Sequence, residues 1–189
     1  ENFSLQQLEK KTGLLSSLDG YWQSANYFND IRETLLNEFT PRHLPAFPHW
    51  ITIDNTVAVH VRRADYLAEH RYGFLGINYY EDAIAMMKEK IADPLFVFFS
   101  DDIAWCKANF NNKDVIFFED DKWDKDYLQL HLISKCNHQI IANSSFSWWG
   151  AWLNTNPGKI VIRPATPFND ERLLYESHYP DEWVAIKNN

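Results

Sequence analysis

The sequence is poor in glycine and cysteine, and each shortage excludes a class of protein. It has 6 glycines in 189 residues and no GxGxxG loop, which argues against a dinucleotide-dependent dehydrogenase. Its 2 cysteines, Cys106 and Cys136, are too few for a disulfide scaffold and lack metal-site spacing. We expect both to be buried, reduced thiols. HExxH, GxSxG and CxxC are also absent, which removes common metalloprotease, hydrolase and thiol-redox interpretations.

Long apolar runs and basic runs are missing as well. No apolar stretch approaches the roughly 18 residues of a membrane-spanning helix, and no signal peptide is evident. No run of Lys or Arg exceeds a pair and the net charge is -8, which argues against a nucleic-acid partner. One nucleotide needs only one or two local cations and is compatible with this charge. We expect a cytoplasmic, bacterial type of protein, with peripheral contact to the inner membrane left open.

From residue 57 onward, short apolar runs alternate with amphipathic ones. The apolar runs predict five strands over 57–61, 95–99, 115–118, 139–142 and 159–162. The helical spacings predict helices over 78–91, 100–110, 124–136 and 144–153. Asn78 and Glu81 can form a capping box at the start of the first helix. The alternation predicts an α/β fold, a Rossmann-like, doubly wound and mainly parallel sheet.

We divide the chain into three parts. Residues 1–52 are predicted to be a helical segment and a linker, with a short helix or arm over 1–13 and a helix in the second half of 21–39. Three prolines in the linker exclude regular structure there. Residues 53–168 are predicted to form the nucleotide-binding domain, and 169–189 a C-terminal tail. Aromatic residues make up 16 % of the sequence. For the helix that holds Trp148, Trp149 and Trp152, we expect packing on the sheet, with at least two of the three buried.

Polar clusters follow three of the predicted strands. They are His60, Arg62, Arg63 and Asp65; Ser100, Asp101 and Asp102; and Asn143, Ser144 and Ser145. Ligands bind outside the carboxyl ends of parallel strands, so we expect the clusters to converge at one edge. An arginine fork suits phosphate oxygens, and a helix N-terminus with serine hydroxyls suits an anion.

Each cluster also has a purely structural interpretation. Arg63 can pair with Asp65 or another nearby carboxylate. Ser100 can be a plain N-cap, and acidic residues in a first turn favour the helix dipole. Ser144 and Ser145 can cap their helix with nothing bound. These alternatives stay open at the level of sequence.

Four segments carry a recognisable pattern: GYWQSANYF (20–28), HVRRADY (60–66), FSDDIAWCKANF (99–110) and CNHQIIANSSFSWWGAWL (136–153). They resemble motifs of glycosyltransferase family 11, the α-1,2-fucosyltransferases. The resemblance implies one lobe of a GT-B-type glycosyltransferase with GDP-fucose as donor and a galactose-containing glycan as acceptor. It further implies inverting transfer to a 2-hydroxyl, with no metal and no other cofactor.

The resemblance also implies roles for individual residues. Arg62 would bind the β-phosphate of GDP and, with His60, is the catalytic candidate. His60 and Asp102 would contact guanosine, and Ser144 and Ser145 would hold the pyrophosphate. The other donor-binding candidates are Arg63, Asp65, Asp101 and Asn143.

The sequence departs from the family in two places. Ala64 stands where the family usually has glycine, and the glycine-rich GGLGNQ-like segment is absent. We therefore expect the main part of the acceptor lobe to lie outside these residues. The alternative is a non-catalytic nucleotide-sugar-binding module or an inactive fragment. No residue is assigned as the general base.

Overall fold

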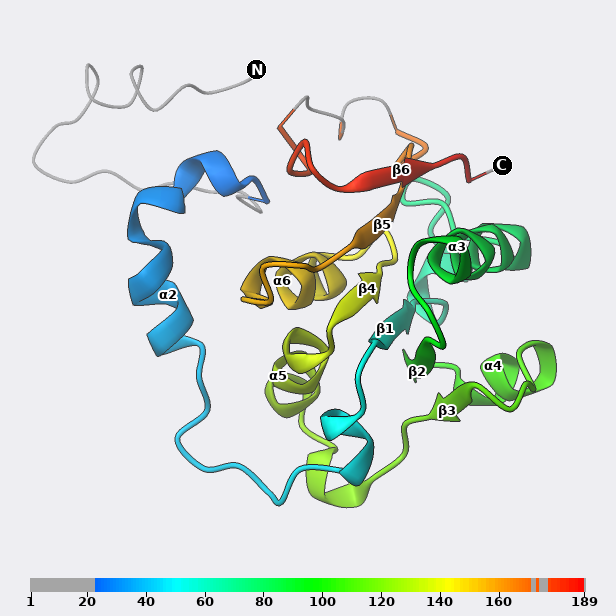
Figure 1. The fold of residues 1–189 in the computed structure, drawn as a ribbon. Helices are drawn as coiled ribbons and strands as arrows, with labels where there is room; N and C mark the ends of the chain where they lie inside the picture. The colour runs from blue at the N-terminus through cyan, green and yellow to red at the C-terminus, as the bar shows by residue number, and fades with distance from the viewer. Residues whose placement is uncertain (1–22, 171–172, 174–176, 189) are drawn as a thin grey trace, which may run out of the picture.

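The computed structural model describes residues 23–170, 173 and 177–188, and its centre is a parallel sheet (Figure 1). The described strands are β1 (Thr56–Val61), β2 (Leu95–Ser100), β3 (Val115–Phe117), β4 (His138–Ile140), β5 (Val161–Pro164) and β6 (Val184–Ile186). Their order is β3-β2-β1-β4-β5-β6, and every neighbouring pair is parallel. The predicted Rossmann-like α/β fold is confirmed, and the five predicted strands are β1 to β5 within a few residues at each end.

A sixth strand, which was not predicted, lies in the segment 169–189 that we named the C-terminal tail. β6 pairs with β5, with Ile162 opposite Val184. Ile186 is 8 % exposed and belongs to the main apolar core. A strand of three residues has too short a pattern to stand out in the sequence.

Helices cover both faces of the sheet (Figure 1). They are α3 (Ile77–Lys90), α4 (Ile103–Asn109), α5 (Asp126–Lys135) and α6 (Ser145–Leu153). Successive side chains of β1 alternate between the two faces. Val57 and Val59 enter the core under α3 and α4, whereas Ala58 enters the core under α5. None of the helices in the described residues is long and apolar enough to cross a membrane.

The helix starts differ from two predictions. α3 begins at Ile77 with Gly76 as N-cap and no capping side chain, so the predicted capping box of Asn78 and Glu81 is wrong. Asn78 already lies inside the first turn, where its backbone is helical and its side chain cannot cap. At α4, the N-cap is Asp102 and not Ser100.

Residues 23–52 run along the outside of α6 and α5 (Figure 1). Two 3-10 turns, η1 (Ala25–Tyr27) and η2 (Asn29–Ile31), precede α2 (Arg32–Glu38), so the helix predicted in the second half of 21–39 is present. The helix or arm predicted over 1–13 lies outside the described residues. A further 3-10 turn, η3 (His49–Thr52), falls inside the predicted linker, so the expectation of no regular structure there is wrong at its end: Pro48 is the N-cap of this turn and does not interrupt it.

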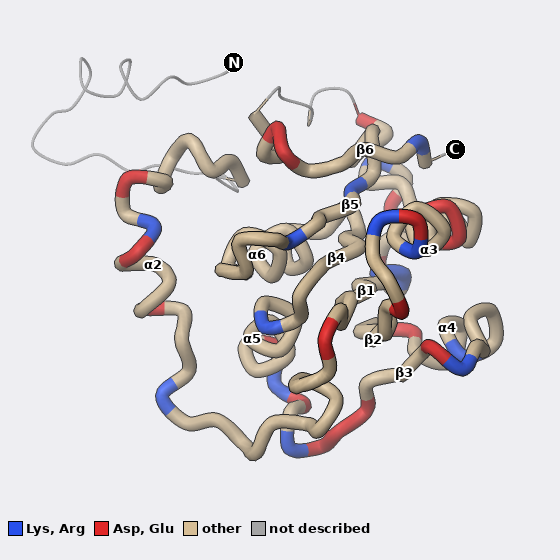
Figure 2. The backbone as a smooth tube through the Cα atoms, in the orientation of Figure 1, with Lys and Arg blue, Asp and Glu red and all other residues tan. Residues whose placement is uncertain are grey.

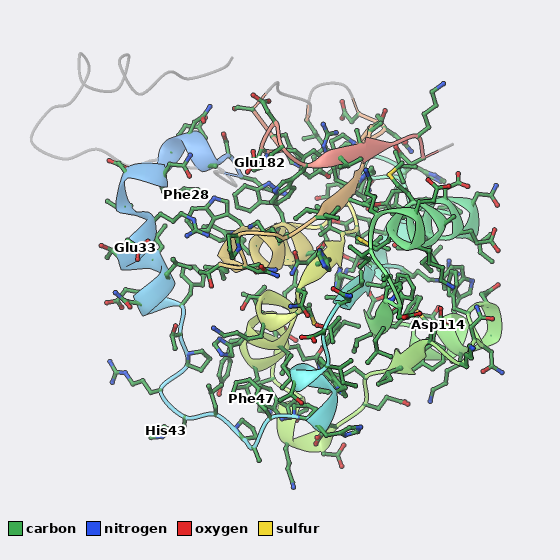
Figure 3. The ribbon with its side chains drawn as sticks, in the orientation of Figure 1. Phe28, Glu33, His43, Phe47, Asp114 and Glu182 are labelled. Carbon is green, nitrogen blue, oxygen red and sulfur yellow. The ribbon has the colours of Figure 1, made fainter. Side chains whose placement is uncertain are left out.

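Aromatic side chains fasten this outer segment to the domain. Phe28 points toward α6 (Figure 3) and stacks on Trp149 at 5.0 Å between ring centroids. Phe39 stacks on the same ring at 5.1 Å. Trp148 and Trp152 are 0 % and 4 % exposed, so the prediction that at least two of the three tryptophans are buried is confirmed. Trp149 is half-buried between the two phenylalanines.

The two cysteines are as predicted, and the charged residues are spread along the chain. Cys106 and Cys136 are buried and free, as predicted. Figure 2 shows acidic and basic positions interleaved along the described chain. No long segment of one sign stands out among the described residues, so the electrostatics of a site depend on the few charged residues next to it.

Candidate functional site

The order of the strands defines where a ligand site is expected. The chain builds β1, β2 and β3 outward on one side, then crosses to place β4 on the other side of β1. The carboxyl ends of β1 and β4 form the switch point, where open α/β sheets bind their ligands. The first and third polar clusters follow these two strands, and the second follows β2 beside them.

His60 is the last but one residue of β1 and is 7 % exposed. Its ring lies 5.2 Å from the ring of Phe146, the second residue of α6. Within the described part of the chain, His60 Nδ1 is buried with no hydrogen-bond partner. Burial, assisted by the positive charge of Arg62, lowers the pKa of His60 to about 3. The imidazole is therefore neutral at physiological pH, with a buried nitrogen that can still form a hydrogen bond.

Arg62 extends from the end of β1 and is held by two carboxylates. Its Nη2 lies 2.8 Å from Asp65 Oδ1, and its Nη1 lies 3.2 Å from Asp101 Oδ2. Its guanidinium also lies 5.8 Å from the ring centroid of Tyr66. The side chain is 35 % exposed. The positive charge is thus accessible at the switch point, in a position that its partners fix.

Arg63 forms a salt bridge within the protein, one of the alternatives that the sequence left open, and its partner is Asp102 and not Asp65. Its Nε lies 3.1 Å from Asp102 Oδ2, and its guanidinium covers the Trp105 ring of α4 at 4.1 Å. Asp65 pairs instead with Arg62. Arg63 is 13 % exposed. Its contacts pack it against α4, away from Arg62.

The two aspartates after β2 face different partners. Asp102 accepts a hydrogen bond from the backbone N–H of Trp105 at 3.0 Å and so caps α4. Ser100 Oγ accepts from the backbone N–H of Asp102 at 2.9 Å. The carboxylate of Asp101 instead contacts the turn after β1, where it accepts from the backbone N–H of Arg63 at 2.9 Å. The structure therefore brings both aspartates to the first cluster, one through each arginine.

The cluster after β4 combines a buried asparagine with the start of α6. Asn143 Nδ2 donates to the backbone oxygens of Tyr72, Gly73 and Pro167 at 2.8–2.9 Å, so its amide holds two loops together. Ser144 is the buried N-cap of α6, and its side chain forms no capping hydrogen bond. The exposed Ser145 begins the helix. The first backbone N–H groups of a helix have no partner within the helix, and such groups suit an anion.

Tyr66, which was not among the predicted site residues, joins the ends of β1 and β4. Its hydroxyl donates to the backbone oxygen of Asn143 at 3.1 Å. Burial raises the pKa of Tyr66, while the charge of Arg62 and a hydrogen bond with the Ser144 side chain act in the opposite direction. Its place in the HVRRADY segment was the available signal. Phe146, which packs on His60, was also missed, because an apolar side chain in a helix is usually core.

A cavity of about 830 Å³ lies at the opposite edge of the domain, where α6 ends. Arg32 and Lys159, two cations that line it, are bound to backbone oxygens at the end of α6. Arg32 donates to the backbone oxygen of Trp152 at 2.9 Å, and Lys159 donates to the backbone oxygens of Ala151 and Asn154 at 2.7 and 2.9 Å. Burial lowers the pKa of Lys159 to about 8. These groups stabilise the end of α6 and leave the switch point as the candidate site.

Comparison with known proteins identifies a family and several relatives. The model of Glycosyl transferase family 11 matches residues 11–187. An alpha-1,2-colitosyltransferase from Escherichia coli is 37 % identical over 181 residues, which are 89 % of this chain and 61 % of that protein. The O-antigen biosynthesis glycosyltransferase WbnK from Escherichia coli is 37 % identical over 140 residues, 70 % of this chain and 45 % of that protein.

More distant relatives come from mammals. The galactoside 2-alpha-L-fucosyltransferase SEC1 of Bos taurus is 27 % identical over 190 residues, 91 % of this chain and 52 % of that protein. The chain thus spans about half the length of the curated relatives it matches, with 61 % as the highest share of the three named here. The family model covers most of the chain, and the resemblance seen in the four sequence segments is confirmed: the chain belongs to glycosyltransferase family 11.

Proposed function

We propose that the protein transfers L-fucose from GDP-fucose to the 2-hydroxyl of a galactoside with inversion, and that this chain forms the donor-binding lobe of a GT-B-type enzyme. One observation carries the proposal. The accessible guanidinium of Arg62 and the N-terminus of α6 flank the switch point of the sheet. A planar cation and a helix N-terminus together suit a diphosphate.

The same two groups suit the chemistry of the transfer. Breaking the sugar–phosphate bond leaves additional negative charge on the GDP leaving group. Arg62 is already oriented by Asp65 and Asp101, so its charge can stabilise that leaving group without reorganisation during the reaction. We infer that Arg62 and the α6 N-terminus serve in place of a metal ion.

His60 fits a contact with guanosine better than the role of general base. With a pKa of about 3, its neutral ring binds a proton too weakly to accept one efficiently near pH 7. Its Nδ1 has no hydrogen-bond partner among the described residues and is instead available to bind a ligand group. We infer that the acceptor proton goes to a group of the acceptor side or to the leaving phosphate.

A second donor has a specific observation in its favour. A relative at 37 % identity is named a colitosyltransferase, whereas the bovine fucosyltransferase is 27 % identical. The second candidate is therefore transfer of a colitosyl group by the same site. Competition between GDP-fucose and GDP-colitose for the protein distinguishes the two, because the true donor should bind more tightly.

Calorimetric titration of the protein with GDP, GDP-fucose and UDP tests the proposal. We expect micromolar binding of both guanosine ligands and none of UDP. Equal binding of UDP would remove the assignment of a guanosine site. Binding of GDP-fucose without transfer to any galactoside, tested on the longest form of the protein, would favour the alternative of a non-catalytic binding module.

A further inference from the structure

Asp101 connects the end of β2 to the turn that carries Arg62. β1 and β2 are neighbours, with Val61 opposite Ser100, so Asp101 lies directly beside this turn. Its Oδ1 accepts from the backbone N–H of Arg63 at 2.9 Å, and its Oδ2 accepts from the backbone N–H of Ala64 at 3.2 Å. The same Oδ2 lies 3.2 Å from Arg62 Nη1. One carboxylate thus holds both the backbone of the turn and the guanidinium.

The other carboxylates of the site cannot do this. Asp65 reaches the same guanidinium, but it belongs to the turn itself and its side chain is 59 % exposed. It moves with the turn and cannot fix the turn to the sheet. Asp102 is engaged by Arg63 and by the start of α4. Asp101 is 19 % exposed and is the carboxylate that anchors Arg62 to a second strand.

The contacts of Asp101 also decide how it can act. Both of its oxygens already accept from protein donors, and a carboxylate pointed at a diphosphate would repel it. We propose that Asp101 is a positioning residue for the diphosphate. It acts by holding Arg62 in place and does not contact the nucleotide. This inference rests on the proposed function, because it assumes that Arg62 binds the phosphates of GDP.

A double-mutant cycle tests the inference. GDP affinity is measured for the unmodified protein, Asp101→Asn, Arg62→Ala and the double variant. We expect Asp101→Asn to weaken binding by about 10-fold in the unmodified background and by less than about 2-fold in the Arg62→Ala background, since contacting residues are coupled. An equal loss in both backgrounds would overturn the inference, because Asp101 would then act independently of Arg62.

A comparison of ligands separates positioning from general damage to the fold. Guanosine lacks the diphosphate, so its affinity should change less than about 2-fold in Asp101→Asn if the residue acts through Arg62. Equal losses for guanosine and GDP would contradict the inference. If Asp101→Asn does not fold, Asp101→Glu replaces it in the same cycle, since it keeps the charge and displaces the carboxylate by one methylene.

Asp114 provides a matched control. Asp114 is 25 % exposed and is paired with Lys88 at 2.6 Å, and it lies near β3 and α4 (Figure 3). Asp114→Asn removes a similar partly buried ion pair and should leave GDP affinity unchanged.

If the unmodified protein binds no GDP, the proposed function fails and this inference with it. If it binds GDP and the cycle is additive, this inference alone fails.

Discussion

Gly150 of α6 lies against Ile133 of α5 with no room for a β-carbon between the two helices. A Cβ at position 150 would stand 2.5 Å from Ile133 Cγ2, far inside van der Waals contact. Leu130 Cδ1, one turn earlier on α5, would be 3.6 Å away. The close approach of these helices fixes the start of α6, and with it Ser144 and Ser145, relative to the sheet.

We expect Gly150→Ala to lower the free energy of unfolding by about 1–2 kcal/mol. Overpacking costs about 1–3 kcal/mol, and alanine recovers up to about 1 kcal/mol as the better helix former. Urea denaturation measures the change. Gly158→Ala is the control, because position 158 is exposed and its nearest neighbour would be 3.7 Å away. Equal midpoints for the two variants would show that α5 and α6 can separate without cost.

Arg62→Ala should weaken GDP binding by about 1.5–3 kcal/mol, the range for a hydrogen bond to a charged group. Calorimetry measures the loss. The control is Arg42→Ala, since Arg42 is exposed in the segment between α2 and η3. An affinity that is unchanged in Arg62→Ala would remove this residue from the binding site.

Trp149→Ala should cost about 2–3 kcal/mol of unfolding free energy. Trp149 loses its stacking with Phe28 and Phe39 but is only half-buried, so the cost stays below the roughly 3–5 kcal/mol of a fully buried tryptophan. Trp148→Ala, at a site that is 0 % exposed, should give that larger value. A loss below about 0.5 kcal/mol, as at an ordinary surface position, would mean that residues 28 and 39 do not hold the outer segment in place.

Stability should fall as the pH is lowered from 6.5 to 5. Burial lowers the pKa of His131 to about 4 and that of His60 to about 3, so both rings stay neutral in the folded protein. The unfolded chain takes up these protons from about pH 6.5 downward and is favoured by them, with at most about 1.4 kcal/mol per pH unit for each histidine. The free energy of unfolding from urea denaturation at several pH values measures the slope.

The share of the slope that His131 contributes can be identified by substitution. His131→Gln should reduce the slope by up to about 1.4 kcal/mol per pH unit, because position 131 then takes up no proton on unfolding, whereas the buried His60 and His178 keep their share. His43→Gln, at an exposed site, should leave the slope as it was. The same slope in all three proteins would show that His131 does not titrate between the folded and unfolded states.

Glycosyl transfer by the protein should survive EDTA. Arg62 and the N-terminus of α6 are proposed to balance the charge of the leaving diphosphate, so no divalent cation should be needed. Transfer is assayed with and without the chelator and after addition of Mn²⁺. Activity that disappears with EDTA and returns with Mn²⁺ would overturn the metal-free mechanism.

Most of the sheet was predictable because buried parallel strands are continuous apolar runs. The run LFVFF before Ser100 is β2, and its residues Phe96 to Phe98 are 0 % exposed. β6 was missed because three residues carry no period, and the start of α3 was misplaced because Gly76 leaves no capping signal. Local patterns say nothing about contacts that the tertiary fold supplies.

In the candidate site, too, the positions of residues were predictable from the sequence but their tertiary contacts were not. Strand ends alone predicted that Arg62, Asp101 and Ser144 would gather at one edge of the sheet. They did not predict which carboxylate each arginine meets, because Arg62 and Arg63 are adjacent in sequence but point to different neighbours. Tyr66 was missed for a related reason, since its contact with Asn143 spans 77 residues.

The position of β4 beside β1 has a consequence for how the chain must be made. Thr56, the first residue of β1, and Asn137, just before β4, are hydrogen-bonded and 81 residues apart in sequence. One side of β1 therefore has no neighbouring strand until the ribosome has reached β4, which begins at His138, and such long-range pairing slows folding. During that interval the chain exposes an apolar strand edge that invites aggregation, so the time between the synthesis of β1 and that of β4 is when chaperones would matter most.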